Sequence, residues 1–158
     1  MWAPYRSASS IAMLLGIFGA PLGSSASAKD LEMLARLLIP AYMAQNFAVL
    51  CVDQDAQFLS GLREGMTLVG AFAEHVKKEV TFGLPESEAV KVRVTAADAA
   101  RNVAREEMQL LGGQNSSVPT EALKRWCERS AKYFISNIMS KHREKHEEFD
   151  RLVEAAKR

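Results

Sequence analysis

The sequence contains few of the residues on which several classes of protein depend. It has two cysteines, three histidines and 8% aromatic residues in 158 positions, and its formal net charge is only +1. A nearly neutral chain has no electrostatic field to attract nucleic acid, so we expect no nucleic-acid partner. Its longest apolar run has ten residues, about half of what a membrane-spanning helix needs.

The sequence motifs of common catalytic and cofactor sites are also missing. It holds no Cys-x-x-Cys pair, no Gly-x-Gly-x-x-Gly, no P-loop, and no arrangement of Ser/His/Asp or Cys/His typical of a nucleophile. We therefore expect a protein without enzymatic activity and without a cofactor. An enzyme whose site is assembled from residues far apart in the sequence remains an alternative, because active sites are spatial arrangements.

The first 28 residues have the pattern of a secretory signal peptide. Arg6 is followed by the apolar run of residues 11–20, and small residues at Ala26 and Ala28 suit a signal peptidase. Cleavage after Ala28 would leave residues 29–158 as a single helical domain. The pattern predicts export to the periplasm or the extracellular space, with no stable membrane anchor after processing.

Cys51 and Cys127 are the only cysteines, and they lie 76 positions apart. Exported compartments favour disulfides, and two cysteines make one bridge with no thiol left over. We therefore predict a disulfide between Cys51 and Cys127. Two unrelated buried thiols are the alternative.

Four segments have the apolar spacing of amphipathic helices. The first covers about residues 30–52, with a kink or a restart at Pro40, and the second ends near residue 80. The third covers about residues 87–111, and the fourth covers residues 119–157 without a helix-breaking residue. The short connections predict an all-α antiparallel bundle of about four helices with a long C-terminal helix.

The third segment is ambiguous, because Val90, Val92 and Val94 alternate with charged residues as in a strand. A strand there would need a partner, and a lone hairpin is only marginally stable. We therefore favour a helix. A helix that begins only at Thr95 is a further alternative, since residues 95–98 match the spacing of a capping box.

The fourth helix is predicted to be longer than a compact bundle can cover. At 1.5 Å per residue it would span about 58 Å, whereas a bundle of this size needs helices of roughly 35 Å. Its last part, from about Lys141, must project, bend back or pack on a second chain. Phe149, Leu152 and Val153 continue its apolar stripe. We expect these three residues to form a contact surface for another protein or for self-association.

His142, His146 and Asp150 follow one another at i,i+4 spacing, so they share one face of this helix. Two imidazoles and a carboxylate can hold a divalent metal ion. Arg143 follows His142, so the motif is not His-Glu-x-x-His. The alternatives are a solvated face, on which the histidines pair with nearby glutamates, and a pH-dependent contact. His75 is expected to be a histidine at the core boundary that is hydrogen-bonded to a neighbour.

These observations predict a small exported helical protein that acts by binding a partner and catalyses no reaction. The alternative is a metal-binding protein that uses the histidine and carboxylate row on its last helix.

Overall fold

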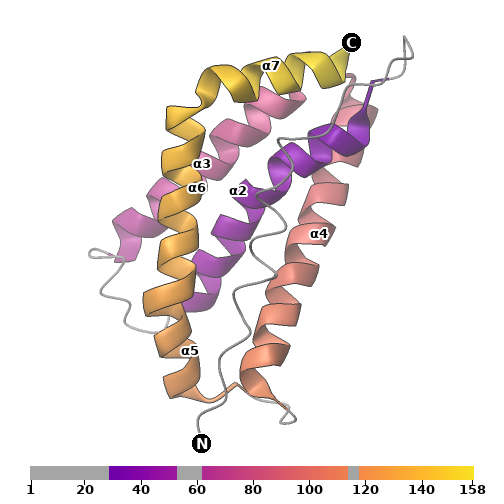
Figure 1. Ribbon diagram of the computed structural model, residues 1–158. Helices are drawn as coiled ribbons and strands as arrows, with labels where there is room; N and C mark the ends of the chain where they lie inside the picture. Colours follow the sequence, from indigo (N-terminus) through magenta and orange to yellow (C-terminus); the bar gives the residue numbers. More distant parts are fainter. Residues whose placement is uncertain (1–28, 53–61, 114–117) are drawn as a thin grey trace, which may run out of the picture.

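The computed structural model describes residues 29–52, 62–113 and 118–158, so the signal-peptide pattern of residues 1–28 lies outside the described residues. Every regular element in these three ranges is helical, which confirms the all-α prediction, and the helices form a bundle around α2 (Figure 1). Their order is α2 (Leu31–Cys51), α3 (Leu62–Thr81), α4 (Glu86–Gly112), α5 (Thr120–Trp126), the π-helical turn η3 (Cys127–Ala131), α6 (Lys132–Glu144) and α7 (His146–Lys157).

Helix α2 is the centre of the bundle and contacts α3, α4, α6 and α7. Leu34, Leu38 and Ala44 are fully buried along it. The helix passes through Pro40 without a restart, because apolar burial on both sides of the proline holds the turns together although one backbone hydrogen bond is lost. In the described part of the chain, α2 alone is long and apolar enough to cross a bilayer, and 56% of its most apolar window is buried in the bundle.

Helix α4 is continuous through the ambiguous valines, which confirms the helical interpretation. Val92, Ala96 and Ala100 are almost completely buried at intervals of four residues, whereas Val90 and Val94 are 41% and 52% exposed. Small side chains on the buried face let α4 lie close against α2. Gly113, with a φ of 61°, follows the last residue of the helix, because glycine adopts this backbone conformation without a steric penalty.

The predicted disulfide between Cys51 and Cys127 is present, with an S–S distance of 2.03 Å. It joins the end of α2 to the first residue of η3, and both cysteines are fully buried. Phe47 packs edge-on against Trp126 and Phe134 beside it, with ring centroids 4.9 and 5.2 Å apart. A buried disulfide of this kind is typical of proteins in an oxidising compartment.

The long C-terminal helix expected from the sequence is interrupted. Lys145 leaves the helical conformation with φ −116° and ψ 28°, and the chain bends there between α6 and α7. Helix α7 then lies across the end of the bundle (Figure 1). There the backbone N–H of Asp30 donates to the carbonyl oxygen of Ala156 at 2.8 Å. Of the three ways to accommodate the excess length, the structure therefore shows the one in which the chain bends back.

The bend changes the role of the apolar residues in α7. Phe149 and Val153 are 8% and 3% exposed and belong to the same core cluster as Leu34, against which Leu152 also packs. The expectation that Phe149, Leu152 and Val153 form an external contact surface is corrected accordingly. Folding α7 back removes their apolar surface from water within the same chain, so no second chain is needed to cover it.

Candidate metal centre

The bend at Lys145 brings two parts of the sequence together at one end of the bundle. His142 is in the last turn of α6 and His146 is the first residue of α7. On α3, His75 and Glu79 are one helical turn apart and face them. All three histidines of the chain therefore meet around one carboxylate.

Glu79 is the centre of this cluster, because each histidine directs its Nε2 atom at its carboxylate. Oε1 is 3.2 Å from the Nε2 of His75 and 3.3 Å from that of His146. Oε2 is 2.9 Å from the Nε2 of His142. The carboxylate thus divides the histidines into two groups, with two imidazoles at one oxygen and one at the other.

Asp150 contacts the cluster from outside. Its Oδ2 lies 3.3 Å from the Nδ1 atom of His146, on the side of the ring opposite Glu79. This contact fixes the orientation of the His146 ring. It also favours the tautomer that leaves the lone pair on Nε2.

The cluster has a partly buried floor and an exposed rim. The floor consists of Glu79 and His142, whose side chains are 16% and 11% exposed. Phe72 and Phe149 cover the His142 ring edge-on at 5.4 and 4.8 Å. The rim consists of His75 and His146, whose side chains are 59% and 45% exposed.

Burial and charge act differently on the histidines of floor and rim. Burial lowers the pKa of His142, although the Glu79 carboxylate opposes this effect. A hydrogen bond at its own backbone, together with the carboxylates of Asp150 and Glu79, raises the pKa of His146. The floor histidine therefore favours the neutral form more strongly than the rim histidine does.

Three donor atoms of this cluster are arranged so that one metal ion could reach them. His75, Glu79 and His146 each offer one ligand atom, and these atoms lie within 4.8 Å of one another. Tetrahedral coordination with bonds of 2.0–2.1 Å places neighbouring ligand atoms about 3.3 Å apart. The two nitrogen–oxygen separations of 3.2 and 3.3 Å already have this length.

The structure brings His142, His146 and Asp150 together, but Asp150 contacts the ring nitrogen that faces away from the other donors. Sequence reasoning missed His75 and Glu79 as parts of this cluster. Their i,i+4 spacing on α3 is a signal of the same kind as the spacing of His142 and His146. Only the packing of α3 against the bend shows that the two pairs belong together.

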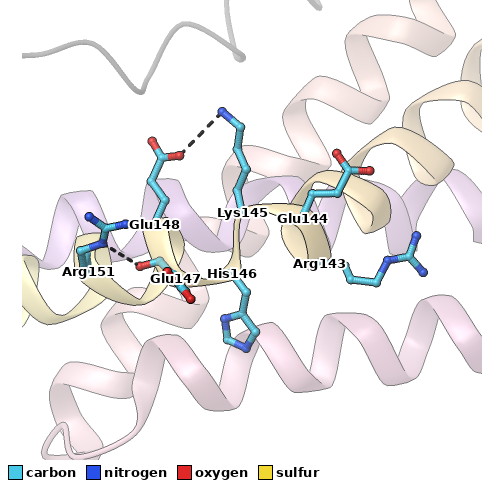
Figure 2. A pocket seen from close by; sticks show the side chains of 7 residues that line it. All are labelled: Arg143, Glu144, Lys145, His146, Glu147, Glu148 and Arg151. Carbon is cyan, nitrogen blue, oxygen red and sulfur yellow. Dashed lines mark hydrogen bonds and ion pairs between the residues drawn. The ribbon is translucent and has the colours of Figure 1, made fainter.

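The glutamates next in sequence to His146 are not its partners. Figure 2 shows the His146 side chain pointing away from those of Lys145 and Glu148, which pair with each other at 3.6 Å. Arg151 donates from Nε to the backbone oxygen of Glu147 at 3.1 Å. His146 also lines the surface hollow that these residues form, so this hollow adjoins the exposed rim of the histidine cluster.

Comparisons with protein-family models, with curated proteins and with solved structures found no match for this chain. What the cluster can do must therefore follow from its own geometry.

Proposed function

We propose that this protein binds a divalent first-row transition-metal ion through His75 Nε2, Glu79 Oε1 and His146 Nε2. One observation carries the proposal: all three histidines of the chain, from α3, α6 and α7, converge on a single partly buried carboxylate. Histidines scattered over a solvated surface would not be expected to meet in this way.

The charges of the cluster favour a metal over a set of ion pairs. Glu79 faces all three imidazoles and Asp150 faces only His146, so these two carboxylates can balance at most two protonated rings. Three neutral imidazoles offer lone pairs but no positive charge, whereas a divalent cation uses those lone pairs and supplies the charge. The lowered pKa of His142 agrees with a neutral ring at the floor.

The contacts around the three donors are those that metal sites use to hold their ligands. Ligating histidines commonly donate their second ring N–H to a carboxylate, and ligating carboxylates are themselves hydrogen-bonded. Here Asp150 is the carboxylate at the second ring nitrogen of His146, Nδ1, and His142 is the hydrogen-bonding partner of the Glu79 carboxylate at Oε2. Two imidazoles with one carboxylate suit zinc, copper, iron or nickel, whereas calcium and magnesium prefer ligand sets made only of oxygen.

The protein is proposed to work outside the cytosol. The signal-peptide pattern of residues 1–28 and the buried Cys51–Cys127 disulfide support this location together, since disulfides persist in oxidising compartments. Mass spectrometry of the protein recovered from its own compartment should find Lys29 at the N-terminus. An intact residue 1 in that material would contradict export through a cleaved signal.

Among the two functions considered from the sequence, the geometry favours metal binding over binding of a partner protein. The partner-binding hypothesis relied on Phe149, Leu152 and Val153, and these side chains pack within the core of their own chain. The metal-binding hypothesis changes its ligand set: of His142, His146 and Asp150, only His146 offers a donor atom to the group, and His75 and Glu79 supply the other two.

Zinc uptake at neutral pH, measured by equilibrium dialysis, tests the metal-binding proposal. We expect one ion per chain and at least a tenfold weaker affinity in Glu79→Gln, because the amide loses the charge and one acceptor oxygen. Glu74→Gln is the matched control, since Glu74 lies on the same helix but pairs with Lys77 at the surface. His75→Ala, at an exposed position, repeats the test without disturbing the floor. Absence of stoichiometric uptake, or equal affinity in all four proteins, would refute the proposal.

A further inference from the structure

We infer that a metal ion bound at this centre keeps a coordination position open to solvent, so that a small chelating ligand with nitrogen and oxygen donors can take the ion directly. The inference rests on the proposed function and concerns how that site exchanges its metal. It makes the ion an exchangeable cargo of the protein.

The number of donors leaves room for an outside ligand. Three donor atoms in the described part of the chain lie close enough to share one ion, from His75, Glu79 and His146. His142 does not belong to this group, because its Nε2 is occupied with the other oxygen of Glu79. Zinc takes at least four ligands, and sites with three protein ligands complete the shell with an exchangeable molecule.

The distribution of burial places the open position on the outer side. Glu79 approaches the ion from the floor, and Phe72, Phe149 and His142 close the space near it. His75 and His146 form the exposed rim, so the side of the ion away from the floor faces water. A small ligand arriving from solvent would therefore meet the metal before it meets the core.

The fold does not depend on the metal to stay together. The Cys51–Cys127 disulfide joins α2 to η3, and Phe149 and Val153 hold α7 in the core. Structural zinc sites, by contrast, close their coordination shell and supply folding free energy. An ion at this rim can therefore leave while the bundle stays folded.

These features predict an associative transfer. The incoming ligand forms its first bond at the open position while the protein ligands are still bound. The imidazoles of His75 and His146 and the carboxylate of Glu79 then leave in turn, and the chelator takes their places. The rate of such a transfer depends on the chelator concentration, whereas release from a closed site is limited by spontaneous dissociation.

Stopped-flow mixing of the zinc-loaded protein with nitrilotriacetate at several concentrations tests this mechanism. We expect the rate of zinc removal to rise in proportion to the chelator concentration over at least a tenfold range, with an unchanged helical circular dichroism signal after removal. A rate independent of chelator, or loss of the helical signal on removal, would overturn the inference and leave metal binding intact. Absence of zinc uptake in the preceding dialysis would overturn both.

The variant His75→Ala gives a second, independent readout. Removing this exposed ligand opens a second coordination position on the zinc ion. The slope of the zinc-removal rate against chelator concentration should therefore increase at least tenfold. Glu74→Gln, one residue away on α3 and paired with Lys77, should behave like the unmodified protein. An unchanged rate in His75→Ala would show that this histidine is not part of an open rim and would contradict the inference.

Discussion

Replacing Phe149 by alanine tests whether α7 truly belongs to the core. Phe149 is 8% exposed and packs with the cluster that contains Leu34 and Val153. Truncation of a buried phenylalanine typically lowers the free energy of unfolding by about 3–5 kcal/mol, from lost apolar burial and the cavity left behind. Phe82, which is 81% exposed just after α3, provides a matched substitution of the same residue type. Its replacement by alanine should change stability by no more than about 0.5 kcal/mol.

Urea denaturation followed by circular dichroism measures both variants on the same scale. We expect a clearly lower midpoint for Phe149→Ala, with a similar slope, and an unchanged midpoint for Phe82→Ala. Zinc affinity should fall as well in Phe149→Ala, because Phe149 covers the His142 ring and holds α7, which carries His146. Equal stability of the two variants would mean that α7 does not pack as described, and would refute the reasoning on which the centre depends.

Three further predictions concern the disulfide, the titration of the histidines and the outer contact of the proposed centre. Cys51→Ser should lower the free energy of unfolding by about 2–4 kcal/mol, and a denaturation curve identical to that of the unmodified protein would contradict a stabilising bridge. Histidine titration by NMR should place the midpoint of His142 below the ordinary value and that of His146 above it. As pH falls below the ordinary histidine pKa, His142 is protonated in the unfolded chain before it is protonated in the folded one, so this residue lowers the stability of the protein until pH reaches its folded pKa. His146 has the opposite effect, because the stability that its protonated form contributes is lost as pH rises through its folded pKa. Reversed midpoints would contradict the assigned environments. Asp150→Asn should weaken zinc binding about 10–100-fold through the orientation of His146, and an unchanged affinity would show that the Asp150 contact does not support the site.

The sequence predicted the helices well where apolar spacing and end signals agreed. Gly112 and Gly113 marked the end of α4 correctly, since glycine favours the left-handed conformation at a helix terminus. Pro40 was expected to kink or restart the helix, and the helix continues through it without a restart. Propensity is a local preference, and burial of the residues on both sides of Pro40 outweighs it.

The bend at Lys145 could not be predicted, because no residue there breaks a helix. Residues 132–157 contain no proline or glycine, so their local preferences allow one continuous helix. The bend arises because α7 buries Phe149 and Val153 against the N-terminal half of α2. That free energy depends on the position of another helix, which the spacing of apolar residues does not specify.

The candidate centre divides in the same way between sequence and tertiary structure. The sequence by itself determined the all-α class, the pairing of its only two cysteines and the shared face of His142, His146 and Asp150, because these follow from local periodicity and parity. Only the tertiary structure decided that α3 brings His75 and Glu79 to those histidines and that Asp150 stays on the outer nitrogen of His146. Helical spacing determines which residues share a face of one helix, but which face meets which is decided by packing the apolar residues of the whole bundle.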